Sequence, residues 1–461
     1  MILLLTLPSS RTAPLRWVAD IVLGEMLGLT FEVADGADGQ ISLTMSGHGL
    51  AMPSLFPDLD ADRAEWKKQL PSVPLPLLDA TQALPEADLE GSLPLLFGSG
   101  DIALSDTSIE CGIDIFGSIF LMLSQFEEAA LPDRDRHDRF PAIASLAWKG
   151  DFLYRPIVDE YCELLWVMMK RLWPGLTRRR REGRIRVTCD VDQPFDRVGS
   201  SLKALVRSIG GDLGRRRSPR LALRRTRNFF AHRRGDLRFD PYYTFDWYMD
   251  VCEREDHAAA FYFIPDHSAG AIDGSYEIDE PRVLALIAGM AGRGHEIGVH
   301  GSYNSYRDGE RIRRERSRLA DACGKAGVDA DIVGNRQHYL RWDACRTPDE
   351  LDAAGYAYDT TGSFADRPGF RYGTSHSFTM WSWQRHAPLE LRQRPLILME
   401  GSVLADAYLG LGHSRAAMGL MQQLRSRALK YGGDFTLLWH NSSLLTKADR
   451  AFFQEIIRKD R

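Results

Sequence analysis

From about residue 184 to the end of the chain, short apolar segments alternate with helical patterns. The segments that we predict to be strands are residues 185–189, 258–264, 296–300, 331–335, 396–400 and 435–440. Helical patterns separate most of them, at residues 282–290, 310–326, 416–430 and 447–458. Repeated β/α units of this kind predict a parallel sheet covered by helices. Their number favours a distorted (β/α) barrel over a small open sheet.

The first part of the chain has a different pattern. Its short apolar segments are broken by turn-rich stretches, and two helices are expected at residues 113–127 and 156–173. A chain of 461 residues is too long for one ordinary core. We therefore predict a smaller α/β accessory domain over residues 1–175, of unknown role, and a catalytic domain over 184–461. The charged loop at 131–140 is a solvated loop, or it forms a salt-bridge network or holds the first domain against the second.

Composition restricts the class of protein. Hydrophobic residues make up 44% and charged residues 26% of the chain, which is typical of a globular protein and not of a disordered one. The six cysteines are scattered singly, so we expect reduced thiols and no cysteine-ligated zinc. The apolar run at residues 2–7 is interrupted by Pro8 and Arg11, far short of a membrane span, and favours a buried first strand over a signal peptide. We expect a cytoplasmic protein, with peripheral attachment to the inner membrane as the alternative.

An arginine-rich segment interrupts the second domain. We predict a basic helical insertion at about 197–238, with Phe229 and Phe230 among its arginines. Such a segment is a solvated insertion, a contact with an anionic membrane or a phosphorylated substrate, or a nucleic-acid contact. The net charge of −5 and the lack of a recognisable nucleic-acid module argue against nucleic acid.

Titratable residues close several of the predicted strands. They are Asp190 and Asp192, His300, Arg336 and His338, and His440. A strand-end aspartate is often a cap, and a lone histidine is often part of a core. However, a β/α barrel places its catalytic groups at the carboxyl ends of its strands. Their recurrence at these positions predicts one active site.

Over about residues 184–461 the sequence resembles the NodB-homology polysaccharide deacetylases, which are carbohydrate esterase family four. The segments that carry the resemblance are Thr188-Cys-Asp190-Val-Asp192, Gly294-His-Glu-Ile-Gly298-Val-His300, Arg336-Gln-His338-Tyr339 and Leu438-Trp-His440. The N-terminal part is similar to an uncharacterised domain that precedes such catalytic domains. Two positions depart from the family: Asn304 stands where the second metal histidine is expected, and His338 replaces a proline.

The resemblance implies a role for each residue. Asp190 is expected to be the general base, Arg336 to hold and orient it, and His440 to be the general acid. Candidates for the carboxylate partner of His440 are Asp359, Glu400 and Asp406. Asp192 and His300 are expected to hold a divalent metal ion, with zinc favoured, and either His338 or Asn304 supplies the third ligand. Aromatic candidates for an acyl slot or a sugar-stacking face are Tyr303, Tyr339, Trp342 and Trp439, although aromatics at strand ends belong to the core at least as often.

These roles imply a hydrolase that removes an N-acetyl group from an amino sugar, in the synthesis of a bacterial surface polysaccharide such as capsule or O-antigen. The expected substrate is nucleotide-linked, lipid-linked or an oligosaccharide. Two alternatives stay open: a catalytically altered carbohydrate-binding or scaffolding protein, and an amide hydrolase with a non-sugar substrate.

Overall fold

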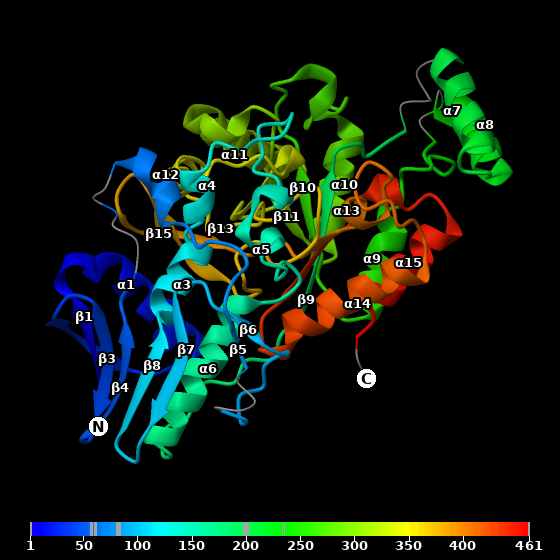
Figure 1. The fold of residues 1–461 in the computed structure, drawn as a ribbon. Coiled ribbons are helices and arrows are strands. Elements are labelled where there is room, and N and C mark those ends of the chain that lie inside the picture. Colours follow the sequence, from blue (N-terminus) through cyan, green and yellow to red (C-terminus); the bar gives the residue numbers. More distant parts are fainter. Residues whose placement is uncertain are drawn as a thin grey trace.

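The computed structural model describes residues 2–55, 59, 62–79, 84–196, 202–232, 234 and 236–459. It is a mixed α/β structure with a six-stranded sheet, a nine-stranded sheet and a small two-stranded sheet (Figure 1). The predicted α/β class is confirmed. All six cysteines are free thiols. Within the described part of the chain, no helix has the length and the apolar character that crossing a bilayer requires.

The six-stranded sheet belongs to the N-terminal part. Its order is β2-β1-β3-β4-β8-β7, with both parallel and antiparallel pairs. The bounds of its strands are β1 Leu3–Pro8, β2 Phe31–Gly36, β3 Gln40–Met45, β4 His48–Pro53, β7 Gly98–Leu104 and β8 Ser108–Ile113. The two-stranded sheet pairs β5 (Leu77–Leu78) with β6 (Leu93–Pro94). In β1 the buried residues alternate with exposed Leu4, as expected for a strand with one face in a core.

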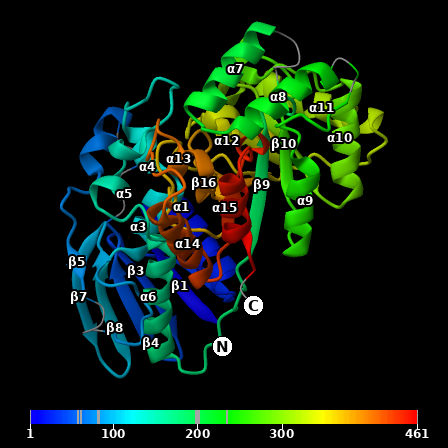
Figure 2. The ribbon, with the colours of Figure 1, turned by 90° about the vertical axis from the view of Figure 1, so that its right-hand side faces the viewer.

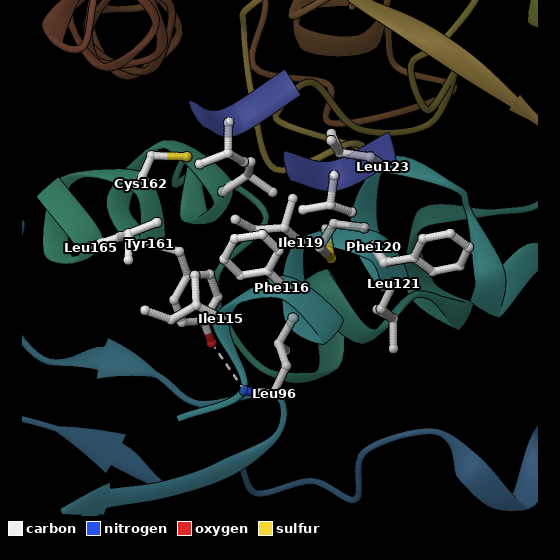
Figure 3. Packing of buried hydrophobic residues seen from close by; sticks show 14 of the residues in the cluster. Leu96, Ile115, Phe116, Ile119, Phe120, Leu121, Leu123, Tyr161, Cys162 and Leu165 are labelled. Carbon is white, nitrogen blue, oxygen red and sulfur yellow. Dashed lines mark hydrogen bonds between the residues drawn. The ribbon is translucent and has the colours of Figure 1, made fainter. Parts of the chain in front are cut away.

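The helices in the described residues of this part all contribute side chains to one hydrophobic core; they are α1 (Thr12–Ala19), α3 (Ile115–Leu123), α4 (Phe126–Ala130), α5 (Leu146–Lys149) and α6 (Ile157–Leu172). Every residue of α3 is buried, because this helix is apolar on all sides. Figure 3 shows Phe116 and Ile119 of α3 close to Tyr161 of α6. The Tyr161 hydroxyl accepts a hydrogen bond from the Leu96 amide at 3.0 Å. The predicted helices at 113–127 and 156–173 therefore lie side by side in one core.

The nine-stranded sheet belongs to the C-terminal part, in the order β14-β15-β13-β12-β11-β10-β9-β17-β16. All neighbouring strands are parallel except the antiparallel pair β14 and β15. The bounds are β9 Ile185–Val191, β10 Ala260–Phe263, β11 Glu296–Gly301, β12 Gly334–Gln337, β13 Tyr358–Asp359, β14 Phe378–Ser382, β15 Ala387–Gln393, β16 Leu398–Met399 and β17 Phe435–Leu438. Each predicted strand overlaps an observed one, whereas β13, β14 and β15 were not predicted.

The helices of this part are α9 (Phe245–Arg254), α10 (Pro281–Gly292), α11 (Gly309–Lys325), α12 (Thr347–Ala353), α13 (Glu400–Leu404), α14 (Arg415–Lys430) and α15 (Lys447–Ile457). The predicted insertion contains the helix pair α7 (Leu202–Gly214) and α8 (Pro219–His232), while residues 197–201, 233 and 235 lie outside the described ones. Seen from the side, the N-terminal sheet lies on the left and helices α7 to α11 lie on the right, with α13, α14 and α15 between them (Figure 2).

The described residues form no closed barrel, because the nine-stranded sheet stays open between β14 and β16. The β14–β15 hairpin packs against the N-terminal part instead. Phe378, Trp381 and Trp383 belong to the N-terminal hydrophobic core, and the Trp17 indole donates to the Thr379 carbonyl at 3.0 Å. That core covers this edge of the sheet, so the edge is protected without pairing to β16.

Candidate functional site

The predicted site residues come from neighbouring strands of the nine-stranded sheet. Asp190 lies in β9, His300 in β11 and Arg336 in β12, while His440 follows β17. These strands are parallel, so their carboxyl ends meet at one edge of the sheet.

Arg336 holds Asp190 at the bottom of the site. Its guanidinium group donates to Asp190 Oδ1 at 3.1 Å and to Thr188 Oγ1 at 2.9 Å. Two further hydrogen bonds, to the carbonyl and hydroxyl oxygens of Thr360, fix the planar group from the other side, each at 3.1 Å. The Arg336 side chain is fully buried, so its orientation is set by these partners. This pair fixes one carboxylate oxygen of Asp190 and leaves the second directed toward His300, 3.6 Å from its Nε2.

Asp192, His300 and His338 form a cluster whose potential ligand atoms all lie within 4.8 Å of one another. His300 Nε2 is 3.2 Å and His338 Nε2 is 3.7 Å from Asp192 Oδ1. His300 Nδ1 donates to the Arg336 carbonyl at 2.8 Å, because a carbonyl oxygen can only accept. In a neutral ring Nε2 then carries a lone pair that faces a carboxylate oxygen.

This arrangement fits a cation. Asp192 Oδ1 is buried and lacks a hydrogen-bond partner among the described residues. Two imidazole nitrogens and one carboxylate oxygen are a typical ligand set for Zn²⁺, with further positions left for water and substrate. The cluster can therefore bind a divalent metal ion.

Asp273 holds the third member of this cluster and was not predicted. It lies in the turn Gly270–Asp273, at no strand end, and its Oδ1 is 3.2 Å from His338 Nδ1. The backbone amides of Ser268, Ala269 and Tyr303 also donate to its carboxylate. Burial opposes ionisation of Asp273, but these hydrogen bonds lower the pKa of its carboxyl below the ordinary value. A carboxylate behind a ligating histidine fixes the ring and increases its basicity.

The same carboxylates control the charge of His338. Burial lowers the pKa of His338, but Asp192 and Asp273 outweigh it and raise that pKa to about 9. In the absence of a cation, His338 is therefore protonated at neutral pH.

Asn304 lies outside this cluster. Its side chain is exposed, its amide oxygen accepts from Arg341 at 2.9 Å, and its amide nitrogen donates to the Ser268 carbonyl at 3.1 Å. Both polar atoms are thus engaged in holding two loops together.

His440 pairs with Glu400, one of its three candidate partners. Glu400 Oε1 accepts from His440 Nδ1 at 2.7 Å. Burial lowers the pKa of His440, but the carboxylate of Glu400 outweighs it and raises that pKa to about 10. The other candidates bind elsewhere: Asp359 accepts from Asn335 and Thr361, and Asp406 pairs with Arg215. His440 Nε2 is 3.7 Å from Asp192 Oδ2, so the protonated ring faces the cluster.

Two of the four candidate aromatics lie at the rim of the site. Tyr303 and Tyr339 have ring centroids 5.3 Å apart, and Tyr339 is 37% exposed. Trp342 and Trp439 are buried and belong to the hydrophobic core of the C-terminal part. For these two tryptophans the alternative holds, that strand-end aromatics belong to the core, and the Trp342 indole donates to Gln125 Oε1 at 2.8 Å.

The charged loop at 131–140 contacts the same rim. His137 Nδ1 lies 2.9 Å from the Tyr303 hydroxyl, and its carbonyl accepts from Arg341 at 2.8 Å. Arg139 donates to the Tyr339 carbonyl at 2.9 Å and is paired with Asp135. Of the three interpretations of this loop, the contacts support the one in which it holds the N-terminal part against its neighbour.

Arg139 thereby binds a strained turn. Tyr339 and Leu340 have φ of 60° and 55°, a left-handed conformation that is uncommon for residues other than glycine. The turn begins at His338, so the N-terminal part supports the segment that carries this histidine.

Comparisons with known proteins give the following likenesses. A family model matches residues 3–174 and is described as a family of unknown function (DUF7033). A search of curated proteins finds no match. A candidate polysaccharide deacetylase from Mycobacterium smegmatis is 16% identical with a TM-score of 0.38, over 60% of this chain and 84% of that one.

Two further solved structures are similar at the same level. A candidate polysaccharide deacetylase from Pseudomonas aeruginosa PAO1 is 12% identical with a TM-score of 0.35, over 68% of this chain and 90% of that one. Puue allantoinase is 13% identical with a TM-score of 0.36, over 62% of this chain and 85% of that one.

Proposed function

We propose that this protein is a metal-dependent hydrolase that removes an N-acetyl group from an amino sugar. One observation supports this most: a histidine held protonated by a carboxylate and an aspartate held by an arginine face the same Asp/His/His cluster. An acid, a base and a metal site are the three elements that amide hydrolysis requires, because the amine leaves poorly as an anion.

In this proposal Asp192, His300 and His338 hold the divalent cation, for which we favour Zn²⁺. When bound, the cation supplies Lewis acidity that polarises the acyl carbonyl and lowers the pKa of water. Asp190 accepts the proton of the attacking water through the oxygen that faces His300, while Arg336 keeps the carboxylate in place.

His440 then donates its Nε2 proton to the departing nitrogen. A carbon–oxygen bond forms, the carbon–nitrogen bond breaks, and the products are acetate and the free amine. Glu400 retains its hydrogen bond to Nδ1 and orients the ring during this transfer. The reaction is redox-neutral and needs water alone as a co-substrate.

For the substrate we propose a nucleotide-linked or lipid-linked amino sugar, or a short oligosaccharide, used in surface polysaccharide synthesis. Two observations support a sugar substrate. The strand-end segments resemble those of the polysaccharide deacetylases, and the ring of Tyr339 beside Tyr303 is partly exposed, which suits sugars because they stack on aromatic faces.

The test is acetate release from N-acetylated sugar nucleotides, lipid-linked sugars and chito-oligosaccharides, with Zn²⁺ or Co²⁺ supplied. Wild-type protein should release acetate from one of these classes, and Asp190→Asn should abolish release while retaining metal. Unchanged release by Asp190→Asn would refute the assignment. Sugar binding without acetate release would favour a carbohydrate-binding or scaffolding protein. Acyl release from non-sugar amides alone would favour an amide hydrolase with a non-sugar substrate.

A further inference from the structure

The α7–α8 hairpin is strongly basic. Residues 202–235 contain eleven Lys and Arg residues and a single acidic residue, Asp212, in a chain whose net charge is −5. Asp212 is buried and accepts from Arg225 at 2.7 Å and from Arg216 at 3.0 Å. Among residues 202–232 and 234, no exposed carboxylate therefore offsets the exposed basic side chains.

Large apolar side chains are exposed on the same two helices. On α7, Leu202, Val206 and Leu213 are 63%, 64% and 49% exposed. Their spacing of i, i+4 and i+11 places them on one helix face. On α8, Leu223 and Phe230 are 53% and 59% exposed and also share a face.

These side chains are not needed to hold the hairpin together. Leu205 and Phe229 form the buried cluster between the two helices, with Ile209 packed against it. Arg220 and Arg227 are exposed on α8 near the Leu223 and Phe230 face, one helical turn or less away. An exposed apolar stripe flanked by arginines is typical of helices that lie in the interface of an anionic membrane.

The hairpin is fixed to the edge of the sheet that carries the site. Buried Arg225 pairs with Asp196, which follows Asp192 by four residues. Arg215, between the two helices, pairs with Asp406, just beyond α13 and Glu400, at 2.7 Å. Figure 1 shows the hairpin at the upper right, set apart from both sheets. It therefore lies apart from the sheets, while its turn and the middle of α8 are joined by these ion pairs to the segments that follow Glu400 and Asp192.

We propose that the α7–α8 hairpin docks on an anionic phospholipid bilayer, with Leu223, Phe230 and the α7 stripe in the interfacial region and the flanking arginines on lipid phosphates. Nucleic acid would use the arginines, but it would leave the aliphatic side chains of α7 without a role, since bases stack on aromatic rings. Docking requires neither metal nor catalysis, so it stands independently of the proposed function.

The experiment is co-sedimentation of the full-length protein with vesicles. Wild-type protein should bind vesicles of phosphatidylglycerol and phosphatidylcholine, bind phosphatidylcholine alone much more weakly, and dissociate as salt increases. Leu223→Ser combined with Phe230→Ser should lower the partition coefficient by about tenfold or more. Arg220→Gln combined with Arg227→Gln should lower it by about tenfold to thirtyfold.

Matched controls change similar side chains elsewhere. Leu77 and Ile143 are 64% and 58% exposed in the N-terminal part, and Leu77→Ser with Ile143→Ser should bind as wild type does. His300→Ala should also bind vesicles normally, which separates this proposal from the metal site. Absence of wild-type binding to anionic vesicles would overturn docking, and so would equal binding by the Leu223/Phe230 variant. Tight RNA binding that survives the apolar changes and competes with vesicles would assign the hairpin to nucleic acid.

Discussion

Glu400 Oε1 and His440 Nδ1 lie 2.7 Å apart, and the opposite nitrogen of the same ring lies 3.7 Å from Asp192 Oδ2. The Glu400 carboxylate thus contacts the ring on the side that faces away from the cluster. This geometry leaves Nε2 available for proton transfer, which is the task expected of a general acid.

Glu400→Gln should change the pH dependence of hydrolysis. Without a cation the pKa of His440 is raised to about 10, chiefly by Glu400, so the ring is protonated at neutral pH. A cation beside Asp192 opposes part of this increase, so the active enzyme should lose activity at an alkaline pH below 10, as His440 loses its proton. A neutral amide stabilises the imidazolium less than a carboxylate does, so the alkaline limb of the kcat/KM profile should move to lower pH. Near neutral pH we expect kcat/KM to fall by about 10-fold to 100-fold.

His440→Ala provides the reference for this change, because it removes the acid altogether and should cost about 100-fold or more. An alkaline limb that stays in place in Glu400→Gln would mean that another group protonates the amine.

His338→Ala and Asn304→Ala should differ in metal content. His338 lies in the ligand cluster, whereas both polar atoms of Asn304 bind other loop residues. Loss of one of three ligands should lower Zn²⁺ affinity by several orders of magnitude, while Asn304→Ala should lower it about tenfold at most. Elemental analysis after dialysis against a chelator of known affinity measures both. The reverse ranking would place the third ligand at Asn304.

Metal binding should become tighter as pH rises. A ligating imidazole must be neutral, and the pKa of His338 in the cation-free protein is raised to about 9. Below pH 9 the cation competes with one proton, so Zn²⁺ or Co²⁺ affinity should increase by about tenfold per pH unit and level off near pH 9. Calorimetry in buffers of different ionisation enthalpy should report about one proton released per cation at pH 7. Zero protons released would contradict the assignment of His338 as a ligand.

The sequence predicts the strands of the site more readily than the shape of the sheet. In β9 the apolar residues Ile185, Val187 and Cys189 alternate with polar ones, and the segment ends in Asp190 and Asp192, so the sequence shows the strand and the site together. The hairpin β14–β15 was not recognised. Phe378 and Trp381 of β14 pack in the N-terminal core, whereas Leu389 and Leu391 of β15 pack in the core of the C-terminal part. Barrel closure is decided by that long-range packing, which no local pattern contains.

The same distinction applies to the site. Strand-end residues could be expected to meet, since carboxyl ends of parallel strands share an edge. The contact of Asp273 with His338 could not be expected from the sequence, because Asp273 lies in a turn whose position is set by tertiary contacts. Glu400 was one of three candidates, and its contact with His440 depends on the pairing of β16 with β17. The catalytic and metal-binding roles of these residues stay predictions until the variants are measured.

Arg139→Ala, a change in the N-terminal part, should lower the Zn²⁺ affinity of the metal site in the C-terminal part. Arg139 donates to the Tyr339 carbonyl at 2.9 Å, in the left-handed turn that begins with His338. Without this hydrogen bond the turn can relax, and His338 would spend less time in the ligand position. We expect Zn²⁺ affinity to fall by about 10-fold to 100-fold, as is usual when a group that orients a ligand is removed.

Arg134→Ala is the matched control, because Arg134 lies in the same loop and donates to carbonyls of Glu128, Leu131 and Asp133, all within the N-terminal part. It should leave Zn²⁺ affinity unchanged. Circular dichroism and urea unfolding of both variants separate a local effect on His338 from loss of the fold, and Arg139→Lys, which keeps the charge without the planar fork, should restore affinity partly. Equal Zn²⁺ affinity in Arg139→Ala and wild type would show that the turn holds His338 without the N-terminal part. If Arg134→Ala lowers Zn²⁺ affinity as much as Arg139→Ala does, the effect belongs to the loop as a whole.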